Sequence, residues 1–428
     1  MERILINNLE ENKNCKIAGF VEKLRDTKYM VFIILKDISG TIQVSLEKEN
    51  NEELVNVALS APAGSVIEVN GKMQLSEYVK NGGKEFIPEN INVISVAAPS
   101  PIEDNANIDT RLDYRFIDLR SERNTLIFKI QSAFIKYMRE YLYSNNFMEI
   151  HTPKLIGTAS ESGSEVFEVK YFDRLAYLAQ SPQFYKQMAM ASGFDRIFEV
   201  GPCFRAENSN TNRHTTEFSC FDVEFSYIDS YEDVMNLEQD MLTYALKKVK
   251  DEYGEQIKNV FDKEVVVPEN KFPRVKLNDL YDILEEKYGY KAETRLDLTT
   301  EAERLAGRYA LEEYNSEFIF VTGFPADKRA FYHMRDENGE LLGYDLIWKG
   351  VEITTGAQRE HRYEILASQA KEKGLDKDVE FYLEFFKYGC PAHGGFGLGI
   401  DRITMLLLGI ESIKEAMFIF RGPNRLNP

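Results

Sequence analysis

The stretch that most constrains the fold is Gly394–Arg402, GGFGLGIDR, in which glycines recur at positions 395, 397 and 399. A two-residue repeat is the period of a β-strand, and it differs from the glycine spacing of a dinucleotide-binding turn. Glycines along one face of a strand let a ligand or another backbone come close. The stretch therefore predicts a glycine-floored strand that leads into a helix beginning near Arg402.

The first 98 residues have the pattern of a small β-barrel. They contain five short segments with alternating or continuous apolar residues, separated by Asn-Gly and Gly-Gly turns, and one helical interruption near 51–60. Short strands in this arrangement are typical of the OB-fold. Prolines then punctuate residues 97–102, and we expect a linker over 99–125.

The remaining residues, 126–428, mix helical and strand patterns. Apolar residues recur at helical spacing over 125–142, about 230–254 and 301–314, and long β-rich stretches lie between and after them. Because no regular strand–helix–strand order appears, an antiparallel or mixed sheet flanked by helices is expected rather than a Rossmann fold. The fold class is therefore predicted to be α+β.

Composition narrows the class of protein further. A net charge of −18 argues against a general nucleic-acid coat protein, although a local basic surface is still compatible with it. No run approaches the ~18 apolar residues of a membrane span, and the N-terminal segment lacks a signal-peptide pattern, so we expect a cytoplasmic protein. The four cysteines form no C-x-x-C pair, so neither a zinc site nor a disulfide framework is expected.

Residues 203–224 carry an unusual set of polar and aromatic side chains. Two predicted strands and the loop between them contain Arg205, Glu207, Arg213, His214 and Phe218. A hairpin that delivers two arginines, a histidine and an aromatic ring to one end suits a polyphosphate with a stacked base. On these residues alone, a solvated hairpin with a surface ion pair explains the pattern equally well.

Two further segments supply candidate ligands. Asp345, Glu352 and Thr355 offer the hard oxygen atoms that Mg²⁺ takes alongside phosphates, unless they simply lie on an exposed strand. The segment 181–187, SPQFYKQ, predicts a helix start, with Gln183 and Lys186 on one face. A capped surface helix with a solvated lysine is the alternative.

Together these segments resemble the class II aminoacyl-tRNA synthetases, and in particular the aspartyl-tRNA synthetases of the compact archaeal type. Residues 128–155 resemble motif 1, the F-R-A-E and R-H-T-T-E-F segments resemble motif 2, and G-F-G-L-G-I-D-R resembles motif 3. The three motifs occur in family order, and the resemblance covers essentially the whole chain. The N-terminal barrel is similar to the anticodon-binding OB domain of the family.

The resemblance implies ATP-dependent attachment of L-aspartate to tRNA(Asp) through an aspartyl-adenylate, with Mg²⁺ as cofactor and a homodimer as the assembly. It assigns catalysis to Arg205 and Arg402. It assigns aspartate binding to Glu161, Gln183, Lys186, Arg205, Thr355 and Arg359. It assigns ATP binding to Arg205, Glu207, Arg213, His214, Phe218, Glu352, Gly399, Asp401 and Arg402. It assigns the metal to Glu352 and Thr355, with Asp345 as a weaker candidate, and the tRNA anticodon to Phe32, Gln43 and Glu85.

The choice of amino acid depends on Lys186, because the asparaginyl relatives are similar to S-G-Q-x-x-L-E and have no cation there. Lys186 and Arg359 would together hold the side-chain carboxylate of aspartate. Asparagine would leave both cations uncompensated, at a cost of roughly 3–5 kcal/mol. The alternatives are an asparaginyl-tRNA synthetase, a synthetase-derived amino-acid ligase and a non-catalytic paralogue; the last should have lost Arg205, Glu352 or Arg402.

Two departures from the family pattern concern the tRNA and the C-terminus. The family often has G-W-V-W in the first strand, whereas this chain has Phe20 and Glu22 at the two tryptophan positions. In some members of the family the second tryptophan accompanies strict selection of tRNA(Asp), so its absence suggests a non-discriminating enzyme that also charges tRNA(Asn). The family's F-P-R-D near the C-terminus is replaced by F-I-F-R-G, which affects local packing beside motif 3.

Overall fold

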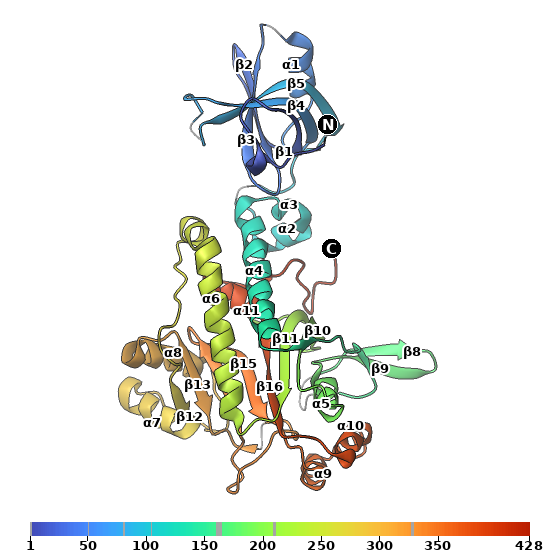
Figure 1. Cartoon of the computed structure of the whole chain (residues 1–428), viewed down its shortest axis with the longest axis vertical. Coiled ribbons are helices and arrows are strands. Elements are labelled where there is room, and N and C mark those ends of the chain that lie inside the picture. Colours follow the sequence, from blue (N-terminus) through green and yellow to red (C-terminus); the bar gives the residue numbers. More distant parts are fainter. Residues whose placement is uncertain are drawn as a thin grey trace. The chain divides into compact units, whose positions relative to one another are not determined.

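The computed structural model describes residues 2–49, 51–79, 82–103, 105–159, 165–208, 211–326 and 329–428. Glu161, which the resemblance assigned to aspartate, lies outside the described residues. The chain divides into two units, Met1–Asn107 and Ile108–Pro428, and each is described by itself (Figure 1). Among the described residues, no helix is both long enough and apolar enough to cross a membrane.

The first unit is a closed barrel, which confirms the predicted OB-fold. Alternate residues point into it, so that Ile17, Val31, Ile33 and Val69 are fully buried in its core. Its strands pair in the order β1-β2-β3-β5-β4, and a short helix, α1, lies between β3 and β4. The bounds are η1 (Ile6–Asn8), β1 (Asn14–Asp26), β2 (Met30–Lys36), β3 (Thr41–Glu47), α1 (Glu52–Leu59), β4 (Val66–Leu75) and β5 (Lys84–Ser95).

The second unit is built on an eight-stranded sheet in the order β12-β13-β14-β15-β16-β11-β10-β6. Its central pairs are antiparallel, while β6 and β12 pair in parallel with their neighbours. The bounds are β6 (Met148–Glu149), β10 (Arg196–Phe204), β11 (Glu217–Ser226), β12 (Arg274–Lys276), β13 (Phe318–Thr322), β14 (Gly343–Trp348), β15 (Val351–Gln358) and β16 (His393–Gly399). A separate small sheet contains β7 (Leu155–Ile156), β9 (Arg174–Leu178) and β8 (Glu168–Tyr171).

Helices flank this sheet, as the α+β prediction requires. The long helices α4 (Glu122–Ser144) and α6 (Tyr231–Phe261) lie side by side and, with α11 (Ile400–Leu408), enclose the main apolar core against one face of the sheet (Figure 1). A second core lies between α7 (Leu277–Tyr288), α8 (Thr300–Tyr314) and strands β13 and β14. The other helices are α2 (Ile108–Asp113), α3 (Arg115–Asp118), α5 (Gln183–Ala191), α9 (Tyr363–Glu372), α10 (Glu380–Glu384), η3 (Phe385–Tyr388) and α12 (Ile413–Ala416).

The three helices expected from apolar periodicity are confirmed as α4, α6 and α8, with α6 continuing beyond residue 254 to Phe261. The helix α6 begins at a capping box, in which the Ser230 and Asp233 side chains satisfy each other's backbone N–H groups. The glycine-rich stretch is also confirmed as a strand, β16, that runs directly into α11.

Candidate active site

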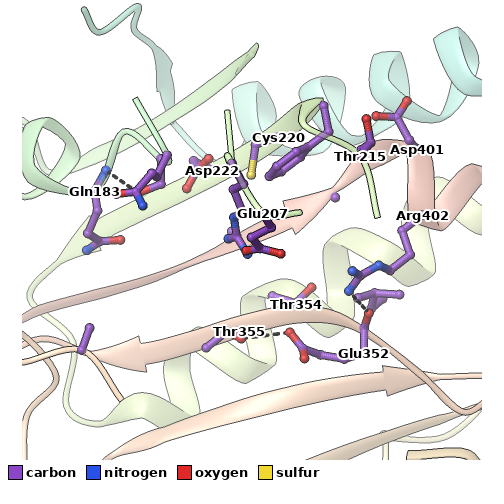
Figure 2. Close-up of a pocket in the computed structure, with 18 of the residues that line it drawn as sticks. Gln183, Glu207, Thr215, Cys220, Asp222, Glu352, Thr354, Thr355, Asp401 and Arg402 are labelled. Atoms are coloured by element: carbon purple, nitrogen blue, oxygen red, sulfur yellow. Dashed lines mark hydrogen bonds and ion pairs between the residues drawn. The ribbon is translucent and has the colours of Figure 1, made fainter. Parts of the chain in front are cut away.

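A cavity of about 350 Å³ opens on the face of the sheet opposite α4 and α6 (Figure 2). Strands β11, β15 and β16 form its floor, and the loop between β10 and β11 and the start of α5 form its walls. The structure brings together in this cavity the predicted residues Gln183, Lys186, Arg205, Glu207, Arg213, His214, Phe218, Glu352, Thr355, Arg359, Gly399, Asp401 and Arg402. Asp345, which the structure also describes, is not one of the residues that line the cavity.

At one end of the cavity, two cations and two carboxylates are buried together. The Lys186 Nζ lies 3.0 Å from Asp222 Oδ1 and 3.3 Å from Glu224 Oε2. The Arg359 Nε donates to Glu224 Oε1 at 3.0 Å. Burial by itself would raise the pKa of Glu224, but Arg359 and Lys186 outweigh it and hold this pKa below its ordinary value. The lysine is therefore part of a buried charge network and not of a solvated helix surface.

This network adds two carboxylates to the pair of cations expected to select the amino acid. The positive charges of Lys186 and Arg359 are compensated in this structure, because both side chains form ion pairs with Asp222 or Glu224. The sequence reasoning missed both carboxylates. A signal was present in F-S-C-F-D-V-E-F-S, where acidic residues sit two apart on a strand that is otherwise largely apolar. Such a strand places both carboxylates on one face.

The glycines of β16 make room mainly for these carboxylates. A Cβ atom on Gly395 would lie 2.3 Å from Glu224 Oε2 and 2.0 Å from the Val223 carbonyl oxygen. A Cβ on Gly397 would lie 3.1 Å from Asp222 Oδ1, whereas one on Gly399 would come no closer than 3.8 Å to the Arg402 side chain. Gly395 therefore allows the close approach of β11, whereas Gly397 and Gly399 line the cavity. That these two glycines leave room for a ligand stays a prediction.

The other end of the cavity carries looser contacts. Arg205 and Glu207 follow the last residue of β10 rather than sharing a strand face, and their closest charged atoms are 4.0 Å apart. The Arg205 guanidinium lies 5.5 Å from the centre of the Phe218 ring. Arg213 lies 3.8 Å from Glu303, a residue of α8 that was not expected at the site. The side chains of Arg205 and Arg213 keep 43% and 35% of their exposure, so a ligand can reach them.

The predicted metal ligands lie side by side on β14 and β15. The Thr355 hydroxyl lies 3.1 Å from Glu352 Oε1 (Figure 2). It also lies 3.0 Å from Asp345 Oδ1. Burial raises the pKa of Asp345 to about 7, although Arg329 contacts both of its carboxylate oxygens and lowers it. The oxygen atoms of Glu352 and Thr355 fit a hard divalent cation. Asp345 fits less well because its carboxylate is already held by Arg329.

Cys220, which lines the cavity, lies close to Cys203 on the neighbouring strand, a contact that the sequence did not suggest. The ligand atoms of Cys203, Cys220 and Asp222 all lie within 4.8 Å of one another. The hydrogen bond to Cys203, together with burial, raises the pKa of Cys220 well above its ordinary value. The Cys220 thiol is therefore protonated at neutral pH and contributes a small, neutral surface to the pocket.

The barrel unit carries the other predicted group on its outer surface. Phe32 is half-buried outside the barrel core, and the Arg25 guanidinium lies 5.0 Å from its ring centre. Gln43 donates to the Ser45 hydroxyl at 3.1 Å, and Ser45 donates to Glu85 at 2.6 Å. Because Ser45 also pairs with Phe32 in register, the three predicted residues share one face, and Phe32 is not a core aromatic.

Comparison with known proteins agrees with both units. The family model described as tRNA synthetases class II (D, K and N) matches residues 107–420, and the model for an OB-fold nucleic acid binding domain matches residues 15–94. The chain therefore belongs to the class II tRNA synthetases of the D, K and N group.

Individual relatives extend over almost the whole chain. An aspartate--tRNA(Asp/Asn) ligase of Aeropyrum pernix is 41% identical over 96% of this chain and 95% of its own. An aspartate--tRNA(Asp) ligase of Pyrococcus abyssi is also 41% identical, over 97% and 96%. A crystal structure of asparaginyl-tRNA synthetase from Pyrococcus horikoshii complexed with asparaginyl-adenylate is similar with a TM-score of 0.93 and 31% identity, covering 100% of both chains.

Proposed function

We propose that the chain attaches L-aspartate to tRNA(Asp) in two steps. The α-carboxylate of aspartate attacks the α-phosphorus of ATP and expels pyrophosphate. The 3′-hydroxyl of the terminal adenosine of the tRNA then attacks the aspartyl-adenylate and releases AMP. Since tRNA charging serves translation, we place the enzyme in the cytoplasm.

The observation that carries this proposal is the buried Lys186 beside Arg359 at the closed end of the cavity. The fold itself does not select the amino acid, because an asparaginyl-tRNA synthetase is similar over the full chain. An aspartate carboxylate can share the donors of Lys186 and Arg359, which now contact Asp222 and Glu224. Only one oxygen of Asp222 contacts Lys186, so its carboxylate can also accept from the substrate ammonium.

Catalysis in this scheme is positioning and charge stabilisation, since neither step requires a protein base. Arg205 contacts the α-phosphate and the aspartate carboxylate. Phe218 and Arg402 enclose the adenine, and Arg213 and His214 meet the terminal phosphates. When bound, Mg²⁺ neutralises charge on the phosphates of ATP, and Glu352 and Thr355 would hold it.

The barrel face with Phe32, Gln43 and Glu85 suits single-stranded anticodon bases, because an aromatic ring stacks on any base. We further propose that tRNA(Asn) is also charged. The relatives from Aeropyrum pernix and Pyrococcus abyssi are both 41% identical but are named for different tRNA sets, so overall similarity does not decide the question. Phe20 and Glu22, which replace the two tryptophans, favour the broader set.

We also propose a homodimer formed through the outer face of α4. A hollow of about 640 Å³ on this helix is lined by residues that include Phe128, Ile135 and Tyr143. Phe418, whose ring packs edge-on against Phe128, is 62% exposed. Apolar surface of this kind is typical of a subunit contact. Light scattering should give twice the chain mass, and Ile135→Asp should give a single chain mass.

The deciding experiment is ATP–pyrophosphate exchange with aspartate, asparagine or lysine, followed by charging of purified tRNA(Asp) and tRNA(Asn). We expect exchange with aspartate only, and aspartylation of both tRNAs. Faster exchange with asparagine would overturn the amino-acid assignment. Charging of tRNA(Asp) alone would leave that assignment in place and end the proposal of dual tRNA specificity.

A further inference from the structure

Glu303, on α8, lies beside the phosphate end of the cavity and was not among the expected site residues. Its Oε2 atom accepts a hydrogen bond from the backbone N–H of Glu352 at 3.1 Å. On the other side, the Arg402 guanidinium donates to the backbone carbonyl of Glu352 at 2.6 Å (Figure 2). Both main-chain polar groups of Glu352 are therefore held by charged side chains from other elements.

A close backbone contact fixes α8 at the right distance. The turn between β14 and β15 has Lys349 and Gly350 at positive φ, 52° and 77°. A Cβ on Gly307 of α8 would lie only 2.4 Å from the Gly350 backbone nitrogen. The helix and the turn thus approach as closely as two glycines allow. This contact brings the Glu303 carboxylate against the first residues of β15.

Glu303 also pairs with Arg213, whose guanidinium is 3.8 Å away. Only 15% of the Glu303 side chain is exposed, against 35% for Arg213. An ion pair at this distance without a hydrogen bond is weak, so a polyphosphate can draw the guanidinium away while Glu303 stays in place. We therefore expect the hydrogen bond between Glu303 and the Glu352 backbone to remain when a polyphosphate binds.

We propose that Glu303 is a positioning residue for ATP binding. By accepting from the Glu352 N–H, it holds the start of β15 so that the Glu352 carboxylate faces the phosphates and the cation that accompanies them. Glu303 itself contacts neither ATP nor metal in this arrangement. The inference rests on the proposed function of the cavity as an ATP site, but not on which amino acid is activated.

Two substitutions of Glu303 separate the effect of side-chain length from the effect of its negative charge. Glu303→Gln keeps an oxygen at the same reach and loses the charge, whereas Glu303→Asp keeps the charge and shortens the reach. We expect the glutamine variant to bind ATP within about threefold of wild type, and the aspartate variant to bind about tenfold more weakly, equal to the loss of one charge-assisted hydrogen bond. Glu301→Ala is the matched control, because Glu301 is on the same helix but pairs with Arg304 in solvent.

The measurement is calorimetric titration of ATP into the protein without amino acid, repeated over a series of Mg²⁺ concentrations. We expect the half-saturating Mg²⁺ concentration to rise in Glu303→Asp and to stay unchanged in Glu303→Gln and Glu301→Ala. Thermal melting of each variant confirms that it is folded. The proposal is overturned if the aspartate variant binds ATP as wild type does, or if the glutamine variant is equally impaired. Failure of aspartate activation in wild type would instead contradict the proposed function and leave these ATP titrations interpretable.

Discussion

A glutamate is fully buried against each face of the eight-stranded sheet, and the pKa values of the two carboxyl groups are shifted in opposite directions. Glu224 lies on the cavity face of β11 with Arg359 and Lys186, which hold its pKa below the ordinary value. Glu238 lies on α6 against the other face, where burial raises its pKa to about 7 and the Tyr344 hydroxyl donates to it at 2.7 Å.

The difference between these two pKa shifts follows from the side chains that surround each carboxyl group. On the cavity face, buried charged side chains are stabilised because each forms an ion pair with a side chain of opposite charge. A charged ligand can take the place of one partner in such a pair. On the helix-covered face, the Tyr344 hydroxyl donates to Glu238, and no charged group of the described residues offsets the burial, so the pKa of this carboxyl is raised. Burial alone therefore does not determine ionisation; the charges brought in by distant segments do.

The largest effect is expected from removing a cation from the cavity face. Lys186→Met leaves Asp222 and Glu224 with Arg359 alone, and losing one partner of a buried ion pair costs about 3–5 kcal/mol of unfolding free energy. Denaturant unfolding at neutral pH measures the loss. Lys258→Met, at a position 63% exposed, is the control and should change stability little. A loss in Lys186→Met as small as in the control would show that the network is not electrostatically coupled.

Arg205→Ala tests the exposed end of the same face. Removing a cation that stabilises developing charge should reduce ATP–pyrophosphate exchange by at least about 10²–10³-fold. Stability should change little, since 43% of the Arg205 side chain is exposed. Melting temperature and exchange rate are measured together, with Arg304→Ala as the control on the outer surface of α8. Near-normal exchange in Arg205→Ala would refute its assignment to the phosphate.

Glu238→Gln tests the helix-covered face, and here the substitution should stabilise. The native pKa of about 7 lies above the ordinary 4.5, so the native state binds the proton more tightly than the unfolded chain. That contribution is complete below pH 4.5 and is lost as the pH rises through 7, amounting to about 3 kcal/mol. Glutamine cannot ionise, so the variant should match wild type near pH 4.5 and exceed it at pH 8. A stability difference that does not vary with pH would contradict the assignment.

The smallest effect concerns the barrel, which is separate from the sheet. Phe32→Ala should cost about 1–3 kcal/mol of tRNA binding through lost stacking. Because the cavity proposed for adenylate formation is lined by residues of the second unit alone, ATP–pyrophosphate exchange should stay at the wild-type rate while the KM for tRNA rises. A change in exchange without a change in KM for tRNA would count against the anticodon role.

Local patterns predicted much of this molecule. Apolar periodicity was sufficient for the barrel strands and for α4, α6 and α8, because secondary structure follows the spacing of side chains that must be buried. The two-residue glycine spacing predicted β16. The candidate site residues in the described part of the chain, apart from Asp345, line one cavity in the second unit or share one face of the barrel. Glu303 was missed because the periodicity of its helix shows only that it is a polar residue of an amphipathic helix, and does not show which distant residues it contacts.

Contacts between side chains that are far apart in the sequence could not be predicted from those local patterns. The order of the motifs and the identity of Lys186 are properties of the chain and are visible in it directly. Three features each join segments far apart in the sequence: the pairing of Lys186 with Asp222 and Glu224, the hydrogen bond of Glu303 to the Glu352 backbone, and the contact of Glu238 with Tyr344 in the core that raises its pKa. They follow from the sheet and helix packing, because charge compensation and desolvation are set by what lies within a few ångströms in space.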